Sequence, residues 1–125
     1  MMVLILLAIG GAAGAVARHA TARTIYRRTG TAFPWGTFVV NTTGSFLLGV
    51  VVTGLAGSPL QVQLGALLAV GFLGDFTTFS TCAYEAVALA RDGRRGRALQ
   101  YLVGSTGAAI AAAVAGLGCG ALLRD

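Results

Sequence analysis

The sequence predicts an all-α membrane protein with four transmembrane helices, because it is too apolar and too sparsely charged for a soluble fold. Hydrophobic residues make up 56% of its 125 residues, charged residues make up only 10%, and the mean hydropathy is +0.81. Three stretches carry no charge, namely residues 1–17, 29–74 and 98–123. One crossing needs about 20 mostly apolar residues, so the middle stretch can cross twice. We therefore expect residues 1–125 to form a single transmembrane domain.

The first helix is expected over about residues 3–21, followed by a loop over residues 22–33. Gly10 and Gly14 are four residues apart, a spacing of small residues that lets another helix backbone approach closely. Arg18 lies near the end of this helix. Its side chain either extends to the membrane interface or lines a charged vestibule.

The second helix is expected over about residues 34–55. Pro34 suits the first turn of a helix, and Trp35 suits the membrane interface. Asn41 and Ser45 are four residues apart and therefore share a helix face. Because an asparagine amide at membrane depth must find partners, Asn41 either bonds to another helix or lines a pore.

The third hydrophobic segment, about residues 60–90, is too long for one straight crossing. About 31 residues in one helix would extend about 46 Å, whereas the hydrocarbon core is about 30 Å thick. Its middle, residues 71–81, contains glycines, an aspartate and hydroxyl side chains, which are costly when exposed to lipid. We expect two half-helices with a break near residues 74–78 in mid-membrane. In this interpretation Gly71 to Thr78 is unwound, and Phe79 to Cys82 restarts the helix.

The fourth helix is expected over about residues 98–123, with Tyr101 and Ser105 on one face. The basic residues are distributed unevenly between the two sides of the membrane. The loops before the second and fourth helices hold Arg23, Arg27, Arg28, Arg91, Arg94, Arg95 and Arg97, whereas the opposite side has Arg124. Basic residues tend to stay cytoplasmic. We therefore expect a multi-pass protein of the cell membrane with both termini extracellular.

The polar residues favour a channel or carrier over an enzyme. The sequence has no nucleophile–base pair, no metal-ligand spacing and no phosphate-binding loop. The net charge of +5 could suit nucleic acid, but the arginines occur at helix ends and in short loops, where they set topology. Neutral donors at membrane depth, interleaved with phenylalanines whose ring edges are weakly positive, can bind a small anion without trapping it. The residues alone do not identify the ion.

Three motifs resemble those of the Fluc/CrcB family of fluoride channels, and the resemblance covers nearly the whole chain. They are Gly10–Arg18 in the first helix, Gly36–Phe46 in the second and Gly71–Thr81 in the third. The third motif is the most specific. The resemblance implies an antiparallel dimer of four-helix subunits with two narrow pores, through which fluoride leaves the cell passively.

The resemblance also implies roles for individual residues. A structural sodium ion, not transported, would be held at the centre of the dimer by the backbone carbonyls of Gly74 and Thr77. The residues of the anion path would be Asn41, Phe79, Ser80, Cys82, Tyr101 and Ser105. Arg18 and Glu85 would have vestibule or structural roles.

Three residues depart from the family pattern. Cys82 stands where a second pore phenylalanine is expected, Asp75 stands where glycine is usual, and Ala109 stands where a further hydroxyl is often found. The arginine bias is also strong for a homodimer whose subunits insert in both orientations. We therefore expect the chain to be half of a heterodimer with an oppositely oriented homologue, with a homodimer as the alternative. In a heterodimer it is either a conducting subunit or a non-conducting structural one. A small multidrug-type exporter is a weaker alternative, because that class relies on a glutamate in its first helix and the first helix here has none.

Overall fold

The computed structural model describes residues 1–124, and its elements are helices. Four spans are long and apolar enough to cross a membrane, which confirms the predicted all-α fold with four spans. The spans are α1 (Met2–Thr29), α2 (Trp35–Gly54), a bent third span (Gln61–Arg91) and α6 (Arg95–Arg124). The third span consists of α3 (Gln61–Leu64), the π-helix η1 (Gly65–Leu73), α4 (Gly74–Phe76) and α5 (Phe79–Arg91).

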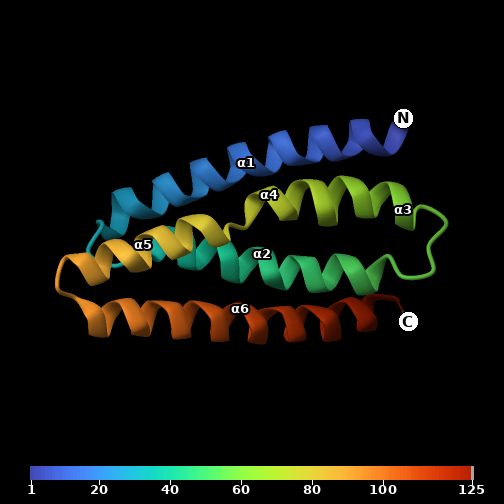
Figure 1. Ribbon diagram of the computed structural model, residues 1–125. Coiled ribbons are helices and arrows are strands. Elements are labelled where there is room, and N and C mark those ends of the chain that lie inside the picture. The colour runs from blue at the N-terminus through green and yellow to red at the C-terminus, as the bar shows by residue number, and fades with distance from the viewer. Residues whose placement is uncertain (125) are drawn as a thin grey trace.

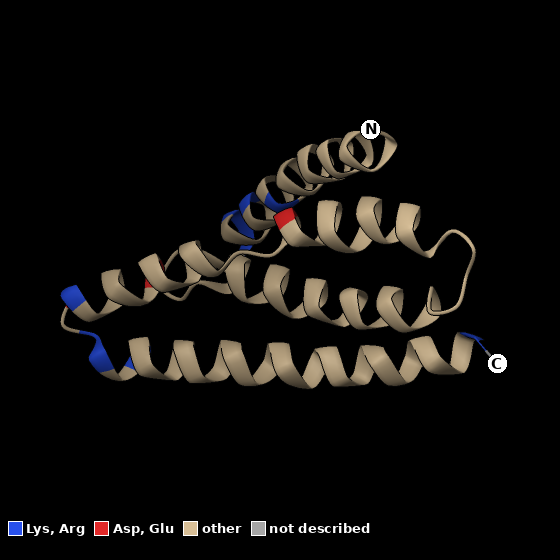
Figure 2. Cartoon of the chain, turned by 45° about the vertical axis from the view of Figure 1, so that its right-hand side comes forward, with Lys and Arg blue, Asp and Glu red and all other residues tan. Residues whose placement is uncertain are grey.

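The spans lie side by side and alternate in direction (Figure 1). α1 packs along η1 and α4, while α6 packs along α2. Both termini lie at one end of the bundle, and the turns before α2 and α6 lie at the other. Most of the arginine-bearing backbone lies towards the end away from the termini, and a smaller group marks the C-terminal end (Figure 2).

Glycines bring two pairs of helices into backbone contact. A side chain on Gly10 or Gly14 would meet the backbone of Leu67 and Phe72 in η1. As their spacing predicts, these two glycines let α1 and η1 approach closely. On the other side of the bundle, Gly49 of α2 lies in the same way against the backbone of α6.

The end of α1 differs from the prediction. The loop predicted over residues 22–33 is wrong as far as Thr29, because α1 continues to that residue. Arginine has a high helix propensity, and cations near a helix C-terminus interact favourably with its dipole. Arg27 and Arg28 occupy this position in the last turn of α1. The high helix propensity of arginine also lets α6 begin at Arg95, ahead of the apolar run.

The third span bends at two residues, at the end of the interval 74–78. The backbone is extended at Thr77 (φ −79°, ψ 157°) and at Thr78 (φ −150°, ψ 122°). The prediction that all of residues 71–78 are unwound is wrong, because residues 71–76 are helical. Fewer freed backbone groups need partners when only two residues leave the helix. The π-helix η1 keeps the preceding segment hydrogen-bonded.

A small cluster of buried residues lies between α5 and α6. It consists of Cys82, Ala86, Leu89, Ala98 and Tyr101. Many large apolar side chains point outward instead, as at Val16, which is 70% exposed. Extensive apolar surface of this kind suits surrounding lipid rather than water.

Candidate functional site

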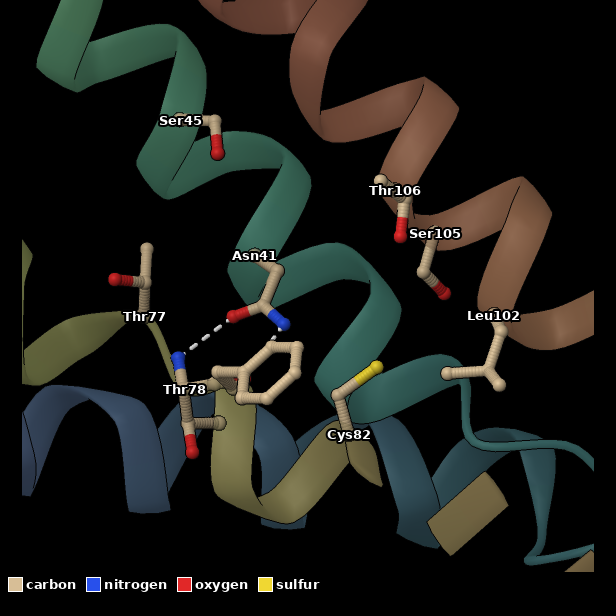
Figure 3. Close-up of a pocket in the computed structure, with 9 residues that line it drawn as sticks. Asn41, Ser45, Thr77, Thr78, Cys82, Leu102, Ser105 and Thr106 are labelled. Atoms are coloured by element: carbon tan, nitrogen blue, oxygen red, sulfur yellow. Dashed lines mark hydrogen bonds between the residues drawn. The ribbon is translucent and has the colours of Figure 1, made fainter. Parts of the chain in front are cut away.

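Asn41 of α2 holds the bend of the third span with its side-chain amide. Its Nδ2 donates to the Thr78 carbonyl oxygen at 2.8 Å, and the Thr78 N–H donates to Asn41 Oδ1 at 2.7 Å (Figure 3). The amide thus replaces the peptide partner that the extended backbone lacks. Thr78 in turn caps α5, since its hydroxyl accepts from the Thr81 N–H at 3.3 Å. Asn41 therefore bonds to another segment, and the same side chain also lines the hollow described next.

A hollow of about 210 Å³ lies beside this contact, between α2, α5 and α6 (Figure 3). It is lined by Asn41, Ser45, Thr77, Thr78, Phe79, Cys82, Leu102, Ser105 and Thr106. None of these residues is charged. The hollow therefore offers hydroxyl and amide groups to a small ion without a fixed full charge.

Two polar groups of the lining have hydrogen-bonding capacity to spare. The Ser105 hydroxyl oxygen is buried and has no hydrogen-bond partner among residues 1–124. Asn41 uses one amide hydrogen on Thr78, so its second can serve another acceptor. Phe79 is 83% exposed, so most of its ring points out of the single chain.

A second polar cluster joins all four spans around Glu85 of α5. Its Oε1 accepts from the Tyr26 hydroxyl at 2.6 Å and from the Thr37 hydroxyl at 3.0 Å. Its Oε2 accepts from the Tyr101 hydroxyl at 2.8 Å. The three donors come from α1, α2 and α6. Hydrogen bonds to a carboxylate are stronger than those between neutral groups, so this cluster ties the spans together.

A cavity of about 220 Å³ lies between the bend and this cluster, with Arg18, His19, Thr78 and Glu85 in its lining. Arg18 points into the protein, where its Nη1 donates to the Thr77 carbonyl oxygen at 3.2 Å. Of the two alternatives for Arg18, this contact favours a place on a cavity wall over extension to the interface.

The bend releases the carbonyl groups of Gly74 and Thr77 from helical hydrogen bonding. In a continuous α-helix they would accept from the N–H groups of Thr78 and Thr81. Those donate instead to the Asn41 side chain and to the Thr78 hydroxyl. Freed carbonyl oxygens are the donors that hold sodium in discontinuous membrane helices. The Thr77 oxygen also accepts from Arg18 Nη1 at 3.2 Å, but its second lone pair is not used by that bond. The two oxygens therefore fit the ion that the resemblance implies.

Only some of the residues predicted for the anion path line the hollow. Four of them do: Asn41, Phe79, Cys82 and Ser105. Ser80 is exposed near the start of α5 and is not in the lining. Tyr101 is fully buried and donates to Glu85 instead.

Sequence reasoning missed Tyr26 and Thr37 as members of the Glu85 cluster. The predicted loop includes Tyr26, but α1 continues through it and directs its ring onto Gly36, where a Cβ would lie 2.6 Å from Tyr26 Cε2. The detectable signal is the spacing of Arg18 and Tyr26, twice four residues, which places them about 80° apart around α1 and therefore on the same side when the helix continues.

Comparison with known proteins identifies the family. Residues 5–117 match the family described as CrcB-like protein, Camphor Resistance (CrcB). Fluoride-specific ion channel FluC from Chelativorans sp. is 43% identical over 115 residues, covering 91% of this chain and 92% of that protein. FluC from Rhizobium johnstonii is 42% identical over 118 residues, covering 94% of each chain. Fluoride-specific ion channel FluC 2 from Clostridium acetobutylicum is 44% identical over 100 residues, covering 80% and 82%. The chain belongs to the CrcB-like protein family.

Proposed function

We propose that this chain is a subunit of a fluoride-specific ion channel, not an enzyme, through which fluoride leaves the cell passively. The family and the relatives named as fluoride-specific ion channels support the proposal. The observation that carries it is the uncharged hollow beside the bend, lined by neutral donors and by Phe79. Conduction requires an ion to bind and leave again, and neutral donors hold an anion less tightly than a full positive charge. Nothing comparable supports a multidrug-type exporter.

In this proposal the lining of the hollow replaces part of the hydration shell of the anion. Ser105 and the second amide hydrogen of Asn41 supply donors. The ring of Phe79 supplies a weakly positive edge. Cys82 supplies a thiol, which is a weak donor, where a second ring edge is expected.

The remaining site residues act from outside the hollow. Tyr101 acts through its hydrogen bond to Glu85. Arg18 adds positive charge to the neighbouring cavity, which raises the local concentration of anions. Ser80 lies near one end of the hollow, with its hydroxyl oxygen 3.4 Å from that of Thr78.

The functional unit in this proposal is an antiparallel dimer with two pores. The exposed ring of Phe79 is available to a second copy. In the same proposal, the bend is a break between two half-helices in mid-membrane. The arginine bias between the ends of the bundle (Figure 2) favours one insertion orientation. A heterodimer with an oppositely oriented homologue therefore fits better than a homodimer. By the same rule, both termini are extracellular in this proposal. The proposed export of fluoride from the cell requires the plasma membrane.

We also propose a structural sodium ion, held by the Gly74 and Thr77 carbonyls of each subunit and not transported. When bound, the ion supplies a positive charge that holds the two bends of the dimer together. Asp75 follows Gly74 directly, and its carboxylate lies against Gly11 of α1. This negative charge favours a cation beside the bend.

Fluoride efflux from liposomes tests the proposal. The purified chain, alone and paired with an oppositely charged homologue, is reconstituted into vesicles loaded with potassium fluoride or potassium chloride. A potassium ionophore starts the efflux, and ion-selective electrodes record it. We expect fluoride to leave much faster than chloride. Efflux with no preference for fluoride in any combination would contradict the proposed function.

A second candidate function is a non-conducting structural subunit, which the weak donor at Cys82 favours. The substitution Cys82→Ser keeps the side-chain size and supplies a better hydrogen-bond donor. If this chain is instead a conducting subunit, as proposed above, its hollow carries fluoride. We therefore expect Cys82→Ser to raise fluoride efflux through a mixed dimer. Efflux that changes only with substitutions in the partner would assign conduction to the partner alone. Cys82→Ala is the matched control, since it removes the donor.

A further inference from the structure

The last turns of α1 carry a basic hollow that the proposed anion path does not use. Its volume is about 520 Å³, and its lining consists of His19, Ala22, Arg23, Tyr26 and Arg27. None of these residues is acidic. His19, Arg23 and Arg27 are spaced four residues apart, so they share a helix face, and all three are exposed.

The two arginines of this hollow make no hydrogen bond to the part of the chain that the structure describes. Two arginines outside this hollow do donate hydrogen bonds to the chain. Arg94 donates to the Ala32 carbonyl at 2.7 Å, and Arg18 donates to the Thr77 carbonyl at the bend. The planar guanidinium groups of Arg23 and Arg27 are therefore open to an outside ligand. Such a group matches the geometry of phosphate with two parallel N–H donors.

The same face of α1 is apolar towards the N-terminus. Ile5, Ile9 and Val16 are 53%, 57% and 70% exposed. At about 100° per residue, these side chains fall within about 40° of Arg23 and Arg27 around the helix axis. Together they form one strip along α1 that is apolar for most of its length and basic at the end where arginines gather (Figure 2).

We propose that this strip binds an anionic phospholipid, with the lipid phosphate on Arg23 and Arg27 and an acyl chain along the apolar part. The arginines stand where an apolar span ends, which is the depth of the lipid headgroups. A free phosphate would leave the apolar part uncovered. A zwitterionic headgroup carries a positive charge beside its phosphate, so it would bind the two guanidinium groups more weakly than an anionic headgroup. The inference requires that α1 spans a membrane, and it does not depend on which ion the protein conducts.

Lipid retention by the purified protein tests the proposal. The protein in detergent is mixed with equal amounts of phosphatidylglycerol and phosphatidylcholine of matched acyl chains, and native mass spectrometry counts the bound lipids. We expect the wild-type protein to retain phosphatidylglycerol preferentially. A basic residue near an anionic surface contributes about fivefold in affinity. We therefore expect the double variant Arg23→Gln/Arg27→Gln to lose most of the preference, by an order of magnitude or more.

Two matched variants separate the strip from general surface charge. Arg23→Lys/Arg27→Lys keeps the charge but loses the planar donors, so we expect an intermediate preference. Arg95→Gln/Arg97→Gln removes the same charge from the start of α6, and we expect a wild-type preference. Any other order of the four proteins would overturn the proposal. Displacement of the lipid by excess inorganic phosphate would also overturn it, as would cross-linking of Val16→Cys to a second copy.

Discussion

The contact between Asn41 and Thr78 can be tested by the substitution Asn41→Leu. It nearly conserves side-chain volume and removes both hydrogen bonds, of 2.8 and 2.7 Å. Two buried backbone groups left without partners would cost about 2–6 kcal/mol, at about 1–3 kcal/mol each. Side-chain hydrogen bonds measured in a membrane protein are weaker, about 0.6 kcal/mol on average and about 1.7 at most. Because the adjoining hollow can admit water to Thr78, we expect a loss of about 1–3 kcal/mol.

Thermal unfolding of the purified protein measures this loss. The midpoint is followed as the decay of the monodisperse gel-filtration peak after heating. In a chain of this size, each kcal/mol lowers the midpoint by about 3–6 °C. Ser45→Ala is the control, because Ser45 lines the same hollow and makes no hydrogen bond among residues 1–124. If Asn41→Leu and Ser45→Ala unfold at the same temperature, the amide does not hold the bend and the reasoning is wrong.

Three further substitutions are expected to change the same midpoint. Gly14→Ala places a Cβ 2.9 Å from a backbone carbonyl carbon of η1, so we expect a loss of about 1–3 kcal/mol. Gly104→Ala is the matched control: its Cβ meets nothing within 4 Å, so it should stabilise the helix by about 0.5–1 kcal/mol. A stabilising effect of Gly14→Ala would contradict the close packing of α1 against η1. Tyr26→Phe removes the 2.6 Å hydrogen bond to Glu85, at a cost of about 1.5–3 kcal/mol. Tyr84→Phe, at a site 76% exposed, should cost nothing, and equal shifts would refute the role of Tyr26.

Hydropathy predicts the number of spans because a charge in lipid is costly, so the spans leave uncharged runs in the sequence. It does not predict where a helix ends. α1 passes through Arg23, Arg27 and Arg28, because arginine favours a helix as strongly as many apolar residues do. The extent of the bend is likewise hidden from the sequence. Glycine and threonine at residues 71–78 weaken a helix, but the side chain that satisfies the freed backbone determines how many residues leave it.

The site is only partly predictable, because local patterns tell which residues share a face and not which faces meet. The rarity of asparagine at membrane depth indicates that Asn41 needs partners, but its partner is 37 residues away. The three donors to Glu85 come from three other spans, and Tyr26 is 59 residues away in sequence. Unless α1 is known to continue past Tyr26, no sequence pattern places the Tyr26 hydroxyl near the Glu85 carboxylate.

The structure places α5 between two attachment points, and α1 and α2 contribute one side chain to each. At the bend, Arg18 and Asn41 bind the backbone of Thr77 and Thr78. At the other point, Tyr26 and Thr37 bind the Glu85 carboxylate. Glu85 is the seventh residue after Thr78, which corresponds to a rise of about 10 Å along the helix. The first turn of α5, which contributes Phe79 and Cys82 to the hollow, lies between the two points. Its exposed side chains therefore take their positions from α1 and α2, and the shape of the hollow depends on helices that contribute little or nothing to its apolar lining.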